Sequence, residues 1–355
     1  MYQGQILTVL GPIQPKELGV TLTHDHILLD LAAILSEPWE TSRKALFEAP
    51  VSLENLGQIR WDELNNRDNC RMVEEDVAID ELIKFKRAGG NAIVDPTNFQ
   101  LGRDPNAMKR ISIATGLNII LGCGHYVDPT HPPDMNERTV EQLADEIVEE
   151  MENGILTQTS KYEGRTVSTQ VRPGIIGELG TSSPITPNEE KVLRGGAKAQ
   201  QTTGAIITVH LHPWHKEGLN VLDILEEAGA DPSRVILDHL NPTLDDLDYH
   251  KAIGARGAYI EYDLFGYEFC MSAGQFAPRD WDSADAICEL IEAGYIEQLL
   301  LSHDICTKTH LTKYGGYGYA HILEHVVPLF YDRGLTPSQV QVMTTENPRR
   351  ALTFI

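Results

Sequence analysis

The chain has 355 residues, and 52 acidic side chains against 29 basic ones give it a formal net charge of −23. A field of this sign repels phosphate backbones and anionic lipids, so we expect no nucleic-acid partner and no membrane-surface role. No apolar run approaches the roughly 20 residues that cross a bilayer, and the first residues lack the pattern of a secretory signal, so we expect a cytoplasmic protein.

Eight short runs rich in Val, Ile and Leu predict β-strands, and helical patterns separate most of them. The runs lie near residues 20–26, 91–95, 118–122, 174–178, 205–210, 234–239, 257–262 and 298–303. Continuous apolar strands that alternate with helices are typical of a buried parallel sheet. We therefore expect an α/β fold, a (β/α)8 TIM barrel that forms a single domain over residues 1–355.

Helix start signals lie between the predicted strands. The segment 186–189, Thr-Pro-Asn-Glu, offers an N-cap, a proline at the first helical position and a capping-box glutamate. Residues 76–88 carry apolar side chains on one helical face, and Asp-Pro at 104–105 and Thr-Pro at 336–337 open two more helices. These signals predict the crossover helices that a parallel barrel requires.

One spacing is irregular, because a long segment at about 36–70 separates the first two strands. A long loop in a compact domain is usually functional or disordered. We expect an extended insertion after the first strand that covers the barrel mouth, either as a lid or as a subunit contact.

The most informative motif is His24-Asp25-His26, which ends the first apolar run. Residues two apart on a strand share one face, so both imidazoles can reach one metal ion. Four further apolar runs also end on a potential ligand, and these ligands are Glu178, His210, His239 and Asp304. Because active sites of such barrels lie at the carboxyl ends of the strands, we expect all six side chains to form one site.

Four histidines and two carboxylates suit a pair of zinc-like divalent ions. Glu178 is the natural bridge between the two ions. The other ligands divide into two sets, His24, His26 and Asp304 around one ion and His210 with His239 around the other. Two such ions can share a water and lower its pKa, so that the bridging hydroxide attacks a carbonyl or phosphoryl group. Asp304 can take up the proton and pass it to the leaving group, which makes it the candidate catalytic residue.

Other chemistries find less support in the sequence. No Gly-x-Ser-x-Gly elbow occurs, which argues against a serine hydrolase, and the glycines match neither the dinucleotide nor the phosphate-loop pattern. The five cysteines show no Cys-x-x-Cys spacing, which favours free thiols. His212 shares strand parity with His210 but lies past the expected strand end, so we expect a pocket or surface role for it. His303 has the opposite parity to Asp304 and is expected to be structural.

With these residues in place, the chain resembles the phosphotriesterase family of the amidohydrolase superfamily, and within it the phosphotriesterase-related subgroup. The motifs that carry the resemblance are the segments 19–26, 174–180, 260–266, 302–305 and 313–319. The resemblance implies a (β/α)8 barrel with two divalent metal ions per chain, usually Zn²⁺, a small-molecule substrate and a homodimer. It places the family's ligands on His24, His26, Glu178, His210, His239 and Asp304. Tyr126, after the third strand, matches a family position near the substrate.

Two departures from the family pattern narrow the expected function. Many members bridge their metals with a carboxylated lysine, whereas this sequence has Glu178, as in the related subgroup. Lactonases that resemble acyl-homoserine lactonases often place an arginine after strand seven, where this chain reads Asp-Leu-Phe-Gly at 263–266. We therefore expect a binuclear hydrolase of a carboxylic ester, lactone or amide, with weak phosphotriesterase activity.

Two narrower substrate classes stay open for the hydrolase, and so does one alternative of another class. An amidase specific for N-acylated amino acids or similar acyl-amines fits the subgroup, and a lactonase fits the wider family. A non-catalytic, metal-containing ligand-binding protein would be expected to lack Asp304 or one of the histidine ligands, and this sequence retains all of them.

Overall fold

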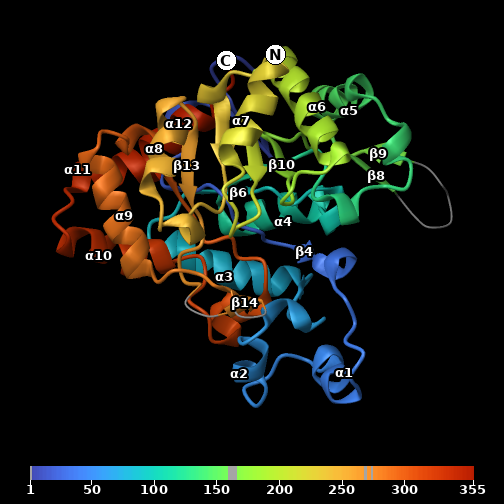
Figure 1. Ribbon diagram of the computed structural model, residues 1–355, viewed down its shortest axis with the longest axis vertical. Helices are drawn as coiled ribbons and strands as arrows, with labels where there is room; N and C mark the ends of the chain where they lie inside the picture. Colours follow the sequence, from blue (N-terminus) through green and yellow to red (C-terminus); the bar gives the residue numbers. More distant parts are fainter. Residues whose placement is uncertain (1, 159–165, 268–269, 273–274) are drawn as a thin grey trace.

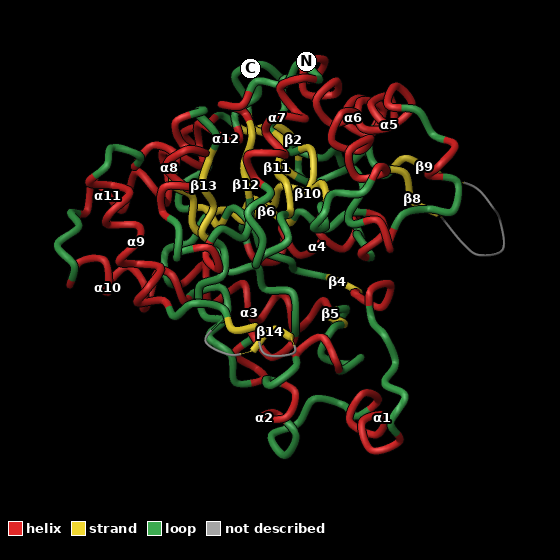
Figure 2. The backbone as a smooth tube through the Cα atoms, viewed as in Figure 1, coloured by secondary structure: helices red, strands yellow, loops and turns green. Residues whose placement is uncertain are grey.

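Eight parallel strands form the centre of the computed structural model, which describes residues 2–158, 166–267, 270–272 and 275–355 (Figures 1 and 2). Each of them overlaps one of the eight predicted runs, so the predicted (β/α)8 barrel is confirmed. The strands are β3 (Thr21–Leu22), β6 (Ala92–Asp95), β7 (Asn118–Leu121), β10 (Ile176–Gly180), β11 (Ile207–His210), β12 (Val235–Leu237), β13 (Tyr259–Tyr262) and β16 (Leu299–Leu301).

The strands pair in chain order, β3 with β6 and β7, and β10 through β13 with β16. Hydrogen bonds at two junctions join these arcs into a ring. Between β7 and β10, the amide of Gly177 donates to the carbonyl of Cys123 over 2.6 Å. Beyond β16 and β3, the amide of Asp304 donates to the carbonyl of His24 over 3.0 Å. The last strand therefore lies beside the first, as closure of a barrel requires.

Helices surround the ring (Figure 2). They are α3 (Glu75–Arg87), α4 (Pro105–Thr115), α5 (Val140–Asn153), α6 (Pro187–Thr203), α7 (Gly218–Glu227), α8 (Leu247–Ala255), α9 (Asp280–Glu292), α10 (Val327–Asp332), α11 (Pro337–Gln341) and α12 (Asn347–Leu352). The predicted start signals are confirmed. The hydroxyl of Thr186 accepts from the amide of Glu189 over 3.2 Å, and the Glu189 carboxylate accepts from the amide of Thr186 over 2.8 Å.

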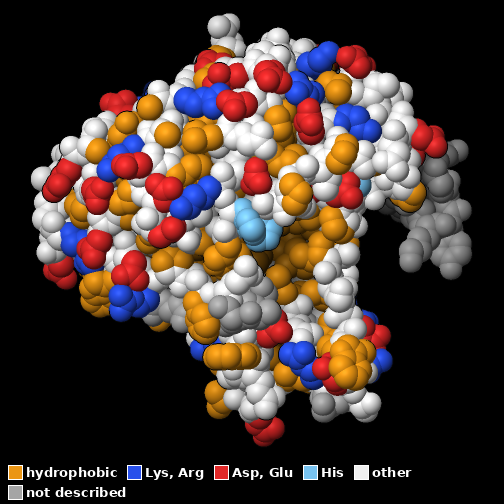
Figure 3. Space-filling view, in the orientation of Figure 1, with side chains coloured by type: hydrophobic (Ala, Val, Ile, Leu, Met, Phe, Trp, Pro, Cys, Tyr) orange, Lys and Arg blue, Asp and Glu red, His pale blue; other side chains and the backbone are white. Residues whose placement is uncertain are grey.

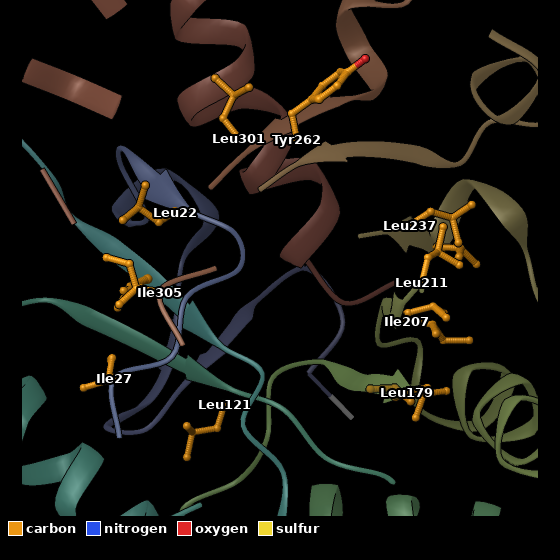
Figure 4. Packing of buried hydrophobic residues seen from close by; sticks show 14 of the residues in the cluster. Leu22, Ile27, Leu121, Leu179, Ile207, Leu211, Leu237, Tyr262, Leu301 and Ile305 are labelled. Carbon is orange, nitrogen blue, oxygen red and sulfur yellow. The ribbon is translucent and has the colours of Figure 1, made fainter. Parts of the chain in front are cut away.

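Alternate residues of the strands pack into two separate cores, because neighbouring side chains on a strand point to opposite faces. The larger core lies between strands and helices, and Figure 4 shows its members distributed around the ring. The smaller core fills the barrel at its amino end and includes Val94, Ile120, Ile206, Ile236 and Leu300. Ile6 of β1 (Ile6–Thr8), which pairs with β2 (Gly11–Ile13), and Leu352 of α12 also belong to it. Both chain termini lie at this end (Figure 1).

The predicted insertion extends from the opposite, carboxyl end of the barrel (blue in Figure 1). It contains α1 (Thr41–Glu48) and α2 (Leu56–Ile59), and the antiparallel pair β4 (Leu29–Asp30) and β5 (Arg71–Met72) closes its base. Asn69 joins it to the segment after β16, since its carbonyl accepts from the amide of Lys308 over 2.9 Å. The surface between insertion and barrel is hollowed and largely hydrophobic (Figure 3).

Two short antiparallel pairs complete the set of described strands, β8 (Leu156–Gln158) with β9 (Thr166–Ser168) and β14 (Cys270–Ser272) with β15 (Gln275–Phe276). Among the described residues, no helix combines the length and the apolar composition that a membrane crossing needs. Four cysteines are free thiols, namely Cys70, Cys123, Cys288 and Cys306.

Candidate metal centre

The six predicted ligands meet at the carboxyl end of the barrel, and the strands carry two of them directly. Glu178 lies within β10, and His210 is the last residue of β11. The other four, His24, His26, His239 and Asp304, follow the ends of their strands. The site is therefore built partly from strand ladders and partly from the turns that leave them.

The predicted strand at 20–26 is too long, because β3 ends at Leu22. The amide of His24 donates instead to the hydroxyl of Ser302 over 2.9 Å, so the backbone leaves the ladder before the two histidines. The shared strand face that we expected for His24 and His26 is therefore wrong. A bend brings the imidazoles together, with ring centroids 5.6 Å apart.

His24, His26 and Asp304 form the first set of possible metal ligands. The Nε2 atoms of His24 and His26 lie 3.6 and 3.4 Å from Oδ1 of Asp304. Ligands of a tetrahedral zinc ion at about 2.0–2.1 Å are separated by about 3.3–3.4 Å. These separations therefore fit one small divalent cation between the three side chains.

Glu178, His210 and His239 form the second set. Nδ1 of His210 lies 3.4 Å from Oε2 of Glu178 and 2.8 Å from Nε2 of His239. The other carboxylate oxygen of Glu178, Oε1, lies 3.4 Å from Nε2 of His26 in the first set. Oε2 also lies 3.7 Å from Nε2 of His24. Because its carboxylate lies beside members of both sets, Glu178 has the geometry that a bridge between two cations needs.

The ring nitrogens of His24 test whether the site fits a metal. His24 is fully buried, and neither of its ring nitrogens has a hydrogen-bond partner among the described residues. A buried polar atom without a partner costs about 1–3 kcal/mol. A cation on Nε2 would remove this cost for one nitrogen, while Nδ1 faces Oδ2 of Asp238 at 3.4 Å. The residues of this site therefore fit a divalent metal ion.

Burial affects the protonation of several predicted ligands. It lowers the pKa of His24 and of His210 well below the usual histidine value, and neighbouring imidazoles lower it further. Both rings are therefore neutral, which is the form that binds metal. Burial also raises the pKa of the Glu178 and Asp304 carboxyl groups. A divalent cation reverses that effect, because it favours the ionised carboxylates.

The pKa of His239 differs from those of the other predicted histidine ligands that burial affects. Burial works to lower its pKa, but the Asp263 carboxylate, with Oδ2 at 3.1 Å from Nδ1, raises that pKa to about 9. A carboxylate on the far nitrogen of a metal-binding imidazole is a common arrangement that orients the ring and strengthens it as a ligand. Asp263 is placed to do this for His239.

Two of the predicted ligands have a strained backbone. His239 and Asp304 have φ angles of 60° and 48°, in the left-handed region that non-glycine residues seldom adopt. Side chains hold both: the amide of His239 donates to Asp263 over 3.0 Å, and the Tyr267 hydroxyl donates to the carbonyl of Asp304 over 2.5 Å. Such strain is concentrated at functional sites, because surrounding contacts must maintain it.

A layer of buried carboxylates beneath the ligands was not predicted from the sequence. Its members are Asp25, Asp95, Asp238, Glu261 and Asp263. Asp25, for example, accepts from the amide of Ile305 over 2.9 Å and from Ser302 over 2.8 Å. The positions of two of them in the sequence could have indicated this layer, since Asp25 separates the two histidines of the first motif and Asp238 directly precedes His239.

The remaining predicted residues divide between the centre and its surroundings. The hydroxyl of Tyr126 lies 3.2 Å from Nδ1 of His210, so this side chain reaches the ligands. His212 packs instead against His215, with ring centroids 4.4 Å apart. His303 is buried, contacts Asp25 over 3.1 Å and accepts from a helix amide, which agrees with the structural role predicted for it.

Comparison with known proteins places this architecture in a family. The chain matches the model of the phosphotriesterase family over residues 4–352. It is 37% identical over 357 residues to an N-acetyltaurine hydrolase from Xenopus tropicalis, and the match covers 99% of this chain and 98% of the relative.

Two crystal structures share the fold. A resiniferatoxin-binding protein from Rhodobacter sphaeroides superposes with a TM-score of 0.91 at 39% identity, covering 98% of this chain and 95% of the other. The phosphotriesterase homology protein from Escherichia coli, complexed with phosphate in its active site, gives 0.77 at 30% identity, covering 95% and 99%. The chain therefore belongs to the phosphotriesterase family of metal-dependent hydrolases.

Proposed function

We propose that this chain hydrolyses the amide bond of a small N-acyl amine, such as an N-acylated amino acid or N-acetyltaurine. The observation that carries the proposal is the pair of ligand sets that face the two oxygens of Glu178. The name of the N-acetyltaurine hydrolase, which aligns over nearly the whole chain, supports an amide as the substrate.

Two divalent ions per chain are part of the proposal, with Zn²⁺ best matched to a donor set of imidazoles and carboxylates. The ligands would be His24, His26, Glu178, His210, His239 and Asp304. When bound, such ions lower the pKa of a water and polarise the acyl carbonyl. The protein supplies the positions, the proton transfers and the exclusion of bulk water.

Asp304 is the proposed proton carrier. It is buried, and one of its oxygens lies 3.4–3.6 Å from the Nε2 atoms of His24 and His26. As the carbon–oxygen bond forms, its carboxylate takes up a proton from the attacking water. As the carbon–nitrogen bond breaks, the same carboxyl group delivers that proton to the amine nitrogen.

Tyr126 is the proposed substrate contact. Burial raises the pKa of its hydroxyl well above 10, and the nearby Glu178 carboxylate raises it further. The phenol therefore keeps its proton and can donate a hydrogen bond. Because the hydroxyl lies 3.2 Å from Nδ1 of His210, it can reach the carbonyl oxygen of a substrate beside the second ligand set.

Further parts of the proposal concern the assembly. The segment 36–70 is proposed as a lid on a single domain of residues 1–355, which is supported by its place beside the hollowed surface (Figure 3). A homodimer is proposed from the family resemblance alone. A cytoplasmic location is supported by the four free thiols, which are typical of a reducing compartment.

A substrate panel tests the proposed reaction. Zinc-loaded protein is assayed with N-acetyltaurine, N-acetyl amino acids, a lactone, a simple ester and a phosphotriester. We expect the highest kcat/KM for an amide and only weak phosphotriester cleavage. A lactone or ester that exceeds every amide would overturn the amide proposal. Ligand binding without turnover of any compound would point to a binding protein instead.

A further inference from the structure

Strand pairing does not fix the position of His26. β3 ends at Leu22, and His26 lies beyond the bend that follows. Its Nε2 atom nevertheless lies 3.4 Å from both Glu178 and Asp304. A ring that must present one particular nitrogen at this place needs contacts from elsewhere in the fold.

The far nitrogen of the ring contacts Thr97, which follows β6 in the neighbouring βα unit. Nδ1 of His26 lies 2.7 Å from Oγ1 of Thr97, and both residues are buried. In His24 and His239, by contrast, Nδ1 faces a carboxylate, that of Asp238 or Asp263. His26 has a hydroxyl group instead, which can either donate or accept.

Asp95 holds Thr97 in place beside His26, since its carboxylate accepts from the amide of Thr97 over 2.9 Å. A neutral imidazole carries one proton, and a ring nitrogen that binds a cation must be unprotonated. The Nε2 atom is the one that lies beside Glu178 and Asp304. A cation bound there requires the proton on Nδ1, where Oγ1 of Thr97 is placed to accept it.

The backbone of His26 is held as well. The Tyr319 hydroxyl donates to its carbonyl over 2.7 Å, and its amide donates to the carbonyl of Ile305 over 3.2 Å. The second oxygen of Asp95 accepts from the amide of Ile27 over 3.0 Å. Asp95 therefore fixes both Thr97 and the residue that follows His26.

We infer that Thr97 is a positioning residue for the metal centre: its hydroxyl accepts from Nδ1–H of His26 and so fixes the tautomer of His26 that binds a cation through Nε2. This inference rests on the proposed metal centre but not on the identity of the substrate. It predicts that the Thr97 hydroxyl affects one of the two ions more than the other, because His26 belongs to one ligand set.

The test compares two conservative variants by Zn²⁺ binding in competition with a chromophoric chelator. Thr97→Val keeps the size but removes the hydroxyl, whereas Thr97→Ser keeps the hydroxyl and removes a methyl group. Loss of an outer-layer partner typically weakens metal binding by about 10–100-fold. We expect a loss of that size for one of two zinc ions in Thr97→Val, and wild-type affinity for both in Thr97→Ser. Thermal unfolding of the metal-free proteins serves as the folding control.

Equal zinc binding by Thr97→Val and wild type would refute the role of Thr97 but not the proposed metal centre. An equal loss in both variants would also refute it, because packing would then be the cause. A wild-type chain that binds no zinc would refute the proposed metal centre, and the inference with it. If Thr97→Val does not fold, ¹⁵N NMR of histidine-labelled, zinc-loaded wild type decides: a proton on Nδ1 of His26 supports the inference, and its absence refutes it.

Discussion

The inward-facing side chains are buried at both ends of the barrel, but they are apolar at the amino end and polar or charged at the carboxyl end. At the amino end, Ile236 and Leu300 lie in an apolar core and are 2% and 0% exposed. Two positions further along the same segments, Asp238 and Ser302 are also 0% exposed. One end of the barrel is therefore a hydrophobic core, and the other is a buried polar layer beneath the proposed ligands.

This difference teaches what each end contributes. Burying an aliphatic side chain stabilises the fold by about 1.5–3 kcal/mol. Burying a carboxylate costs several kcal/mol unless hydrogen bonds or opposite charges compensate for it. The carboxyl end therefore depends on the stability of the rest of the barrel and, in the proposed centre, on bound cations. Substitutions at the two ends should separate activity from stability.

The largest expected effect is at the carboxyl end. Asp304→Asn preserves the size of the side chain but removes its ability to carry a proton. General acid–base groups contribute about 10²–10⁴-fold to rates, and we expect kcat to fall by that factor while two ions stay bound. Parallel elemental analysis excludes a vacated site as the cause. Full turnover with both metals present would remove Asp304 from the mechanism.

The matching change at the amino end should act on stability instead. Ile236→Ala removes a buried side chain from the inner core, and such substitutions typically cost about 2–5 kcal/mol. We expect a lower urea midpoint with unchanged kcat at 25 °C. Ile113→Ala, at a position 65% exposed on α4, is the control and should leave the midpoint unchanged. A large loss of kcat in Ile236→Ala would break the separation between the two ends.

A smaller effect is expected from His250, which is buried outside the barrel in contact with Tyr262 and Thr243. Burial lowers its pKa to about 4, against 6.5 in the unfolded chain. The unfolded state therefore binds a proton below pH 6.5 that the folded state does not, and stability falls as the pH falls. From pH 7 to pH 5 this amounts to about 2 kcal/mol.

The variant His250→Gln should lose this part of the pH dependence. The measurement is the difference between wild type and variant in urea unfolding at pH 7 and pH 5, since other groups titrate in both proteins. An identical pH dependence in the two proteins would show that His250 takes up its proton without unfolding.

The last prediction concerns the proposed bridging residue, Glu178, and is that bicarbonate has no effect on metal assembly. Glu178 supplies its carboxylate directly, so zinc reconstitution of the metal-free protein should proceed equally with and without bicarbonate. Recovered activity and bound zinc are measured in both conditions. A strong bicarbonate requirement would mean that a carboxylated lysine, rather than Glu178, joins the two ions.

The barrel and the proposed ligands could be predicted from the sequence because both depend on local patterns. Apolar runs specify each strand, and a ligand at the end of a run such as 205–210 follows from the topology alone. The contacts that orient the ligands depend on distant pairs. Thr97 and His26 are 71 positions apart, and Asp25 and Ile305 are 280 apart. No local pattern indicates such pairs.

The same reason explains the errors. The apolar run at 20–26 continues past the true end of β3, because Ser302 takes the amide of His24 out of the ladder. The left-handed backbone of His239 and Asp304 depends on tertiary contacts as well, because Asp and His adopt this region more often than other non-glycine residues but still only in a small minority of cases. Sequence patterns therefore predict which residues form the centre better than they predict how those residues are held.

The number of metal ions tests the central claim most directly. Protein purified without chelators and saturated with zinc is subjected to elemental analysis, and anomalous diffraction from its crystals locates the ions. We predict two ions per chain, one beside His26 and one beside His210, with Glu178 contacting both. A single ion at saturation, with Glu178 bound to that ion alone, would contradict the binuclear centre.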